Sequence, residues 1–204
     1  GSNIGYGSAN NIALKQIKTK YALILNPDVL LSKFSLENLL KASKKANNFS
    51  ILAPEEQNNK SGKKDFDESK IILTSVDSVK GFAMFLNLSE FEDVGFFDEN
   101  FFLYFEDIDL CKRLKSKGKK IFLVSNLQIK HLGAQSSSDQ INWERELTRN
   151  WHWMWSTFIY HNKHKGFFVS LFIVFPKLLS SIFKILVYSF LFNNKKKQIY
   201  FMRF

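Results

Sequence analysis

A long apolar run near the C-terminal end limits the folds that are open to this 204-residue chain. Residues 167–192 contain 18 Phe, Leu, Ile or Val in 26 positions. A helix of about 20 apolar residues crosses a bilayer, but Pro176, Lys177 and Lys184 interrupt this run. On the insertion scale two central lysines cost about 5–7 kcal/mol while 18 apolar residues contribute about 5–11 kcal/mol, so hydrophobicity alone leaves a transmembrane helix open.

The polar residues within the run favour a different arrangement. In a helix they fall in one narrow stripe, formed by Ser170, Lys177, Ser181, Lys184 and Tyr188. A helix with a single polar face lies in the plane of a membrane surface. We therefore expect an in-plane amphipathic helix with Lys195 to Lys197 at anionic headgroups, and a transmembrane or re-entrant segment is the alternative.

The charge of the chain is concentrated in the same region. Residues 151–204 hold eight Lys and Arg and no acid, whereas residues 1–150 hold 21 Lys and Arg and all 19 Asp and Glu. Basic charge confined to an apolar, aromatic segment favours an anionic membrane surface over nucleic acid. The sequence thus predicts a helical, membrane-associating tail over residues 141–204, and the single Cys111 excludes an internal disulfide.

Residues 1–140 alternate between predicted strands and helices. Strands are predicted at 21–25, 50–53, 79–86, 120–124 and 127–132, and helices at 35–46 and from about residue 105. Such alternation is typical of an α/β domain. The apolar side of the helix at 35–46 is expected to carry Leu36, Leu39, Leu40 and Ser43, and the polar stretch 54–70 is expected to be a surface loop.

The end of the first predicted strand carries a ligand-binding signal. Asn26 and Pro27 end this strand and expose Asp28 just past its carboxyl end, where ligands of parallel sheets gather. A carboxylate in this position binds a divalent cation together with phosphate oxygens, or caps the next segment in an Asx turn. The local sequence favours neither interpretation.

Glycines mark two places where the backbone can be approached closely. Gly5 and Gly7 precede a predicted helix capped by Ser8, an arrangement that can bind phosphate, although a plain loop is the favoured interpretation of this pair alone. Gly81 interrupts the predicted strand at 79–86, which indicates that a ligand or another backbone comes close there.

The segment at 94–118, VGFFDENFFLYFEDIDLCKRLKSKG, places five carboxylates among large aromatic residues. Acids in such surroundings are costly to desolvate, so the pattern indicates a solvent-filled cleft or a catalytic use. In a helix that begins near Phe105, Asp107 shares an apolar stripe with Leu110, Cys111 and Leu114. Asp107 is therefore a candidate general base.

The other acids of this segment have simpler explanations. Asp109 precedes Arg113 by four residues and is expected to form a surface ion pair with it. Glu106 is explained by the helix dipole. His131, near the end of the last predicted strand, is by itself more often structural than a ligand.

Five motifs in one order resemble the inverting GT-A glycosyltransferases of family 2, particularly the rhamnosyltransferase-like branch. They are NIGYGSANN, NPDV, KGFAM, the acid-rich segment and KHLGAQS, and together they span about residues 3–137. The resemblance implies a Rossmann-like mixed sheet flanked by helices over residues 1–140. The family fold starts with a strand, helix and strand that grip the nucleobase, and this chain begins after that unit, so the resemblance also implies a partial GT-A fold.

The resemblance implies a role for each matched residue. Gly5 and Gly7 match the glycine loop near the donor phosphates, and Gly81 matches a donor-binding glycine. Asn26 and Asp28 match the family's Asp-x-Asp motif. Glu106 and Asp107 match the acceptor-side acidic pair, with Asp107 as the catalytic base.

His131 matches a late metal-ligand histidine. The implied cofactor is a divalent cation, Mn²⁺ or Mg²⁺, held by Asp28 and His131, and an imidazole ligand suits manganese slightly better.

The expected function is transfer of a sugar, with inversion, from a nucleotide-diphosphate donor to a glycan or lipid-linked acceptor. We expect the protein at the cytoplasmic face of the cell membrane, bound peripherally or through one hydrophobic segment. The alternative is a non-catalytic membrane-associated adaptor derived from a glycosyltransferase. A nucleic-acid partner is not expected, because the basic charge lies with the apolar tail.

Overall fold

The computed structural model describes residues 2–31, 35–56, 71–131 and 139–204. The chain divides into two compact units. The sheet unit comprises Ala9–Phe97 and Asp107–Gln135, and the helical unit comprises Gly1–Ser8, Asp98–Glu106 and Ser136–Phe204.

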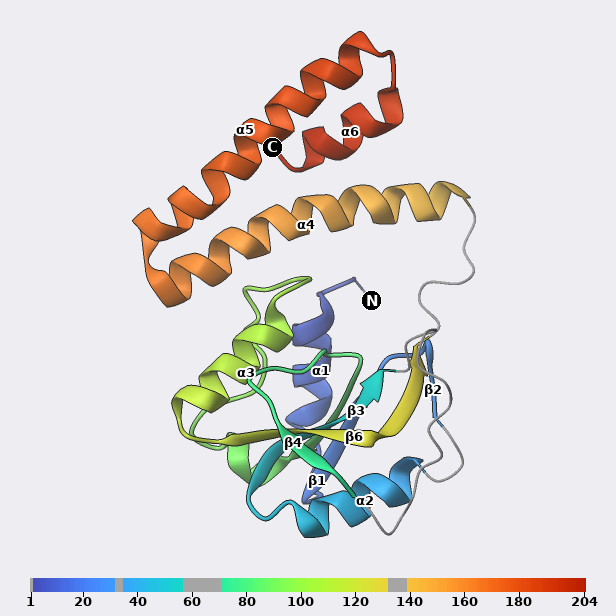
Figure 1. Cartoon of the computed structure of the whole chain (residues 1–204), viewed down its shortest axis with the longest axis vertical. Helices are drawn as coiled ribbons and strands as arrows, with labels where there is room; N and C mark the ends of the chain where they lie inside the picture. Colours follow the sequence, from blue (N-terminus) through green and yellow to red (C-terminus); the bar gives the residue numbers. More distant parts are fainter. Residues whose placement is uncertain (1, 32–34, 57–70, 132–138) are drawn as a thin grey trace. The chain divides into compact units, whose positions relative to one another are not determined.

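The sheet unit is built on a mixed six-stranded sheet (Figure 1), which confirms the predicted α/β class. Its strands are β1 (Tyr21–Leu25), β2 (Val29–Leu30), β3 (Phe49–Glu56), β4 (Leu73–Ser75), β5 (Ala83–Asn87) and β6 (Lys120–His131). The order is β1-β5-β3-β6-β2, and β4 pairs with β6 off this path. β3 and β6 are parallel, and the other pairs are antiparallel.

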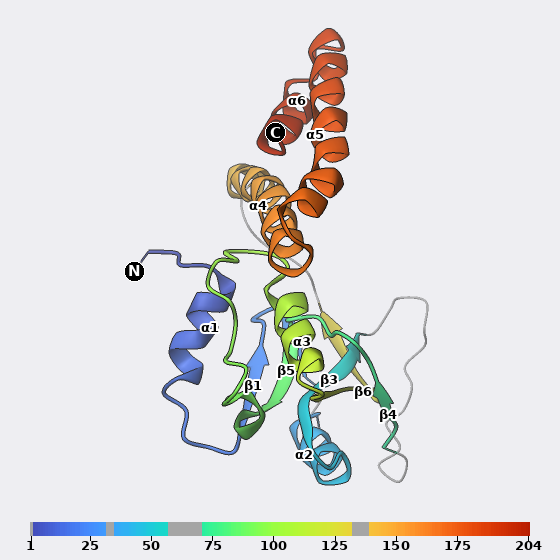
Figure 2. The ribbon, with the colours of Figure 1, turned by 90° about the vertical axis from the view of Figure 1, so that its left-hand side faces the viewer.

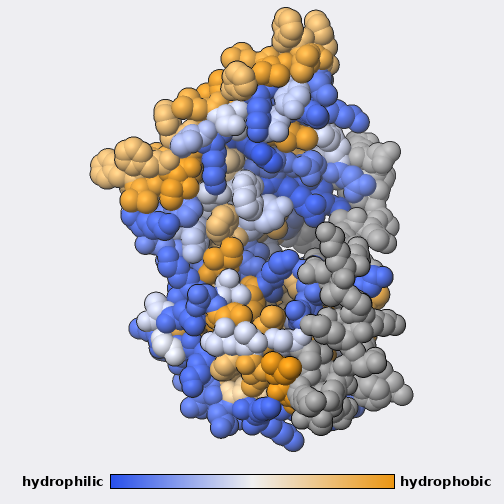
Figure 3. Space-filling view, in the orientation of Figure 1, coloured by the Kyte–Doolittle hydropathy of each residue, from blue (hydrophilic) through white to orange (hydrophobic). Residues whose placement is uncertain are grey.

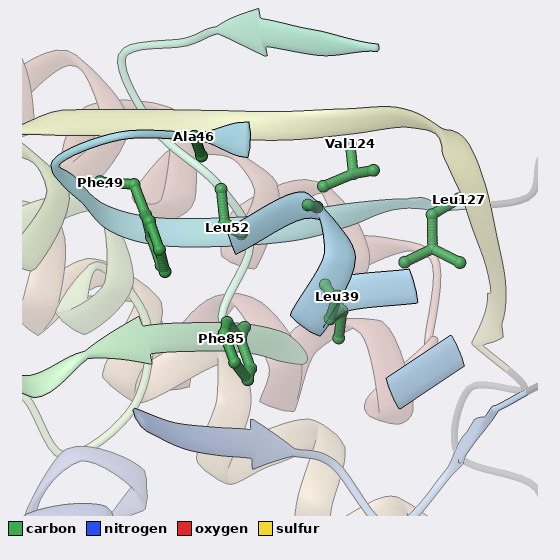
Figure 4. Close-up of a cluster of buried hydrophobic side chains, with 8 residues drawn as sticks. Leu39, Ala46, Phe49, Leu52, Phe85, Val124 and Leu127 are labelled. Carbon is green, nitrogen blue, oxygen red and sulfur yellow. The ribbon is translucent and has the colours of Figure 1, made fainter. Parts of the chain in front are cut away.

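Helices α2 (Ser35–Lys45) and α3 (Glu106–Ser116) lie on opposite sides of this sheet (Figures 1 and 2), and α1 spans Tyr6–Leu14. A buried cluster joins α2 to the sheet, with Leu39 and Ala46 facing Leu52, Phe85 and Leu127 (Figure 4). Helix α2 covers one side of the sheet with Leu39, and α3 covers the other side.

The predicted apolar side of α2 is partly wrong. Leu39 and Ser43 are buried as expected, but Leu36 is 49% exposed and Leu40 is 40% exposed. The fully buried contact is made by Ala42, whose small side chain lets the helix backbone lie close to the sheet. The helix is therefore rotated away from its largest apolar residues.

Strand boundaries are confirmed at β1 and shifted elsewhere. The predicted surface loop is wrong at Pro54–Glu56, which belong to β3, and residues 57–70 lie outside the described residues. The two strands predicted at 120–124 and 127–132 are one strand, β6, whose pairing with β3 jumps from Pro54↔Val124 to Glu55↔Gln128. Proline has no N–H to donate to a ladder, so an irregularity beside Pro54 is expected.

The helical unit contains α4 (Asp139–Lys165), α5 (Phe167–Phe190) and α6 (Asn194–Met202), with α5 packing against both α4 and α6. Only Gly166, with a φ of 86°, separates α4 from α5. Within the described residues, α5 is the one helix long and apolar enough to cross a membrane by length and composition, which is weak evidence for membrane association.

Candidate active site

Asp107 lies in the first turn of α3, where the carboxylate is oriented by two backbone donors. Its Oδ2 accepts a hydrogen bond from the Gly81 N–H at 2.8 Å, and its Oδ1 accepts one from the Ile108 N–H at 2.8 Å. The side chain is half-buried, while Leu110 and Leu114 on the same helix are fully buried. Asp107 is thus a fixed carboxylate at the border between core and solvent.

The close approach expected at Gly81 is present, and the partner is the Asp107 carboxylate. The predicted strand at 79–86 is wrong at its start, because β5 begins only at Ala83 and residues 81–82 form a turn. The Gly81 N–H is bound to Asp107 and is not available to a neighbouring strand. A role for Gly81 in holding a donor stays a prediction.

The same turn also reaches the end of β1. The Phe82 carbonyl accepts a hydrogen bond from the Asn26 N–H at 2.9 Å. The two residues of the turn thus hold the predicted base on one side and the Asp-x-Asp-like segment on the other. This places Asn26 and Asp107, 81 positions apart in sequence, around one dipeptide.

Asp28 and His131 come to the same corner of the sheet through the backbone. The Asn26 carbonyl accepts from the Val29 N–H at 3.2 Å and closes a turn that contains Asp28. Val29 then pairs with His131 in the β2–β6 ladder. Among the described side chains, no group of three or more His, Cys, Asp or Glu is arranged to hold a metal ion.

Asp109 forms the predicted ion pair with Arg113, but its predicted surface location is wrong. The Arg113 Nε lies 2.7 Å from Asp109 Oδ2, and the Asp109 side chain has no exposed surface. Arg113 also donates to the backbone carbonyls of Val94 at 2.9 Å and of Phe96. The buried pair ties residues 94–96, at the start of the acid-rich segment, to α3, which is a structural role.

Cys111 fills space in the core as a small apolar residue. Its side chain is fully buried, and burial raises the pKa of the thiol to about 12. A thiol with so high a pKa is not a nucleophile at neutral pH.

Glu106, which is buried, begins α3 after two residues in the left-handed region. Tyr104 has a φ of 70° and Phe105 a φ of 69°. Such conformations cost about 1–3 kcal/mol each when the residue is not glycine, so surrounding contacts must hold them. Residues 98–106, which we call the acidic loop, receive these contacts from α4 in the helical unit.

Aromatic rings of α4 enclose the end of the acidic loop. The Phe105 ring lies 5.5 Å from that of Trp153 and 5.1 Å from that of Tyr160. Phe102 stacks on His152 at 4.3 Å, and burial lowers the pKa of His152, which favours a neutral ring in this stack.

Polar contacts from α4 fix the rest of the acidic loop. The Ser156 hydroxyl donates to the Leu103 carbonyl at 2.7 Å, and the Lys163 Nζ lies 2.6 Å from Asp98 Oδ2. Burial alone would raise the pKa of Asp98, but the Lys163 ammonium and hydrogen bonds from Asn100 outweigh it and hold the pKa below its ordinary value. The sequence did not indicate these contacts, since the aromatic and basic residues of α4 belong to the tail that is predicted to associate with a membrane.

The glycine pair at the start of the chain contacts the acidic loop. A Cβ on Gly5, whose φ is 88°, would lie 2.6 Å from the Phe102 carbonyl oxygen, which also accepts from the Tyr6 N–H at 3.1 Å. Gly7 lies inside α1 and is buried. The predicted cap at Ser8 is wrong, because α1 begins at Tyr6 and the Gly5 N–H is instead bound by Asn3 Oδ1 at 3.1 Å.

A cavity of about 300 Å³ is lined on one side by residues that flank Gly81. Lys80 and Phe82 line it together with Glu55 and Glu56 of β3, and the Lys80 Nζ lies 2.6 Å from Glu56 Oε2. A larger cavity of about 540 Å³ is lined by Tyr21, the first residue of β1. Asn26 follows the other end of β1, so of these two cavities the smaller one adjoins the turn that holds Asp107.

Comparisons with known proteins agree with the resemblance seen in the sequence. No protein-family model matches the chain. The low-salt glycan biosynthesis hexosyltransferase Agl10 of Haloferax volcanii is 27% identical over 143 residues, which cover 59% of this chain and 46% of that protein. The rhamnosyltransferase WbbL of Escherichia coli is 31% identical over 156 residues, which cover 61% of this chain and 59% of that protein.

The chain thus spans about half the length of the curated relatives that it matches. One solved structure, S. aureus TarS 1–349 in complex with UDP-GlcNAc, matches 99% of this chain and 72% of that chain at 13% identity and a TM-score of 0.48, too small a likeness to support an argument. The chain is similar in sequence to two glycosyltransferases, one named a hexosyltransferase and the other a rhamnosyltransferase.

Proposed function

We propose that this chain carries the site of an inverting glycosyltransferase that moves a sugar from a nucleotide-diphosphate donor to a glycan or lipid-linked acceptor held at a membrane. The observation that supports it most is the Gly81–Phe82 turn, which binds Asp107 through one residue and Asn26 through the other. A single displacement at an anomeric carbon requires a base and a segment that binds the donor phosphates to lie close together. We also propose that the sheet unit has a partial GT-A fold.

Asp107 is the proposed general base. Its carboxylate takes the proton of an acceptor hydroxyl while that oxygen attacks the anomeric carbon, and the bond to the diphosphate breaks on the opposite face with its electron pair leaving on the phosphate oxygen. The Gly81 and Ile108 N–H groups each occupy one oxygen of the carboxylate and keep it oriented. General-base assistance is worth about 100-fold to 10,000-fold in rate.

Asp28 and His131 are the proposed protein ligands of a divalent cation, with Asn26 beside them on the donor side. The fit rests on donor chemistry and on the Val29–His131 pairing, which brings one carboxylate residue and one imidazole residue to the same corner. Carboxylate and imidazole together suit Mn²⁺ and leave the remaining positions to phosphate oxygens and water. When bound, the cation neutralises charge on the departing nucleoside diphosphate.

The relatives and the smaller cavity support the substrate class. Both relatives carry names of enzymes that transfer hexose or rhamnose, so we propose a hexose or deoxyhexose as the transferred sugar. Glu55, Glu56 and Lys80 line the cavity beside the Gly81 turn together with the Phe82 ring. Such carboxylates and an ammonium bind sugar hydroxyls, and a ring packs on the apolar face of a pyranose.

Calorimetric titration tests the donor side of this proposal. We expect UDP, GDP or dTDP to bind in the presence of Mn²⁺ and to bind at least about tenfold more weakly after Asp28→Asn, since a ligand of the cation is lost. The matched control is Asp77→Asn, because the Asp77 side chain is 96% exposed and Asp77 lies 49 positions from Asp28. If none of the three diphosphates binds with or without Mn²⁺, the non-catalytic adaptor is the better account.

A further inference from the structure

Helix α5 exposes one continuous apolar face. Seven large apolar residues recur at intervals of three or four and are each at least half exposed: Phe168, Phe172, Phe175, Leu179, Phe183, Leu186 and Phe190. We call these seven residues the apolar ridge. Figure 3 shows apolar side chains gathered over α5. A soluble surface rarely leaves so long an apolar strip uncovered, and such strips mark interaction sites.

The polar stripe of α5 lies on the side opposite the ridge and is covered within the helical unit. Ser170 has no exposed surface and Ser181 is 4% exposed. Tyr188 stacks on Tyr200 of α6 at 5.6 Å, and the Lys184 Nζ lies 4.8 Å from the centre of the same Tyr200 ring. The polar residues of α5 are therefore used in packing between helices, and the apolar ones are left for an external partner.

We propose that the apolar ridge of α5 docks in the plane of an anionic lipid bilayer, with α4 and α6 remaining packed on the other side of the helix. Charge identifies the partner as a lipid surface. Residues 151–204 carry eight basic side chains and no acid, and Lys195 to Lys197 open α6 directly after α5. A bilayer that contains anionic lipids offers an apolar interior for the ridge and negative headgroups for the basic side chains.

The packing of α6 favours the in-plane arrangement over a transmembrane one. A spanning helix meets lipid on all sides, so α6, which contacts the polar stripe through Tyr200 and Lys196, would have to leave it. Lys177 and Lys184 would then enter the hydrocarbon region, which is strongly unfavourable. In the plane of the membrane, only the ridge enters the bilayer and these contacts persist. This proposal does not depend on the transferase activity.

Binding to vesicles of phosphatidylcholine and phosphatidylglycerol tests the ridge. We expect Phe172→Asp to weaken binding by about tenfold to a hundredfold, because the free energy of burying one Phe is lost. The matched control is Leu36→Asp, since Leu36 is 49% exposed on α2, and it is expected to change binding less than twofold. Equal effects of the two variants would overturn the proposal.

A second copy of the chain is the competing occupant of the ridge. If Phe172→Asp dissociates a dimer in lipid-free buffer and leaves vesicle binding unchanged, the ridge is a protein interface and the proposal is wrong. A monomer in buffer whose vesicle binding needs Phe172 supports it.

Depth measurements separate in-plane docking from spanning. Phe168→Cys, Leu179→Cys and Phe190→Cys each introduce an exposed thiol that can carry a fluorophore, while the native Cys111 is buried. Spin-labelled lipids should quench all three at the same shallow depth. Deepest quenching at Leu179 with shallow ends would show a spanning helix and overturn the proposal.

Replacing Lys195, Lys196 and Lys197 with Gln tests the charge argument. Binding of the triple variant to vesicles that contain phosphatidylglycerol should fall by at least about fivefold, which is the contribution of one lysine near an anionic surface. Binding to pure phosphatidylcholine should not change. An equal loss on both kinds of vesicle would contradict an anionic lipid partner.

Discussion

Helices α3 and α5 are both amphipathic, and they turn opposite faces inward. In α3, Leu110 and Leu114 are fully buried and Asp107 stands at the edge of the core. In α5, Ser170 and Ser181 are buried, while Phe172 is 80% exposed. An amphipathic pattern defines two faces of a helix but does not say which one the protein covers.

The difference indicates which medium each helix meets. A helix that hides its apolar stripe and shows a carboxylate is built to work in water, as a catalytic base requires. A helix that covers its polar stripe with its own neighbours and leaves a Phe-rich ridge open is built to meet lipid.

The largest difference in stability is expected between replacing Arg113 of α3 and replacing Lys184 of α5. Arg113→Met should destabilise the fold by about 3–5 kcal/mol, because it leaves the Asp109 carboxylate buried without its ion-pair partner. Lys184→Met on α5 should cost only about 0.5–1 kcal/mol, since it removes a cation–π contact with Tyr200. Urea unfolding of both variants measures this, and equal losses would show that the two polar faces are equivalent.

The apolar residues of the two helices should respond in the opposite sense. Leu114→Ala removes a fully buried side chain and should destabilise the chain by about 2–5 kcal/mol. Phe172→Ala should change stability in lipid-free buffer by no more than about 0.5 kcal/mol. Thermal unfolding compares them. A large loss for Phe172→Ala would mean that the ridge is part of the core.

Much of the sheet unit follows from local sequence, whereas its contacts with distant residues do not. β1 was predicted to the residue, because Tyr21–Leu25 is a short apolar run closed by Asn26 and Pro27. The turn at Gly81 was mistaken for strand, since its conformation depends on Asp107, 26 residues away. A local pattern cannot report a partner at that distance.

The residue types of the candidate site were predictable from the sequence, but the contacts that hold these residues in place were less so. The resemblance marked Asp28, Asp107 and His131, and the structure shows backbone links that the motifs do not contain. The grip of α4 on the acidic loop was missed, because Ser156 and Leu103 are 53 positions apart and Lys163 and Asp98 are 65 apart. The aromatic and basic residues of α4 fit a membrane belt equally well by composition.

Two glycines, Gly5 against the acidic loop and Gly118 after the end of α3, offer a smaller test of how tightly the acidic loop is held. Gly5→Ala should cost about 1–3 kcal/mol through left-handed strain, and more through the clash of its Cβ with the Phe102 carbonyl. Gly118→Ala, at the C-terminal end of α3, meets no atom within 4 Å and should cost only about 1–2 kcal/mol of conformational strain. Urea unfolding compares the two variants. If Gly5→Ala lowers the free energy of unfolding no more than Gly118→Ala does, the acidic loop can shift to accommodate the added Cβ.

The smallest effect concerns pH. Since the folded-state pKa of Asp98 is lowered, the Asp98–Lys163 pair adds stability that is fully present above about pH 4 and is lost as the pH falls through that lowered pKa. Lys163→Met should reduce stability by about 1 kcal/mol or less at neutral pH and flatten the acid side of the stability profile. An unchanged acid profile would show that Lys163 does not stabilise the acidic loop.

The rate of sugar transfer by Asp107→Asn tests the central claim most directly. With Mn²⁺ and a panel of nucleotide sugars, we expect turnover to fall by about 100-fold to 10,000-fold while donor binding stays near that of the wild type. Asp77→Asn should transfer at the wild-type rate. Weakened donor binding with turnover intact in Asp107→Asn would contradict the assignment of Asp107 as the base.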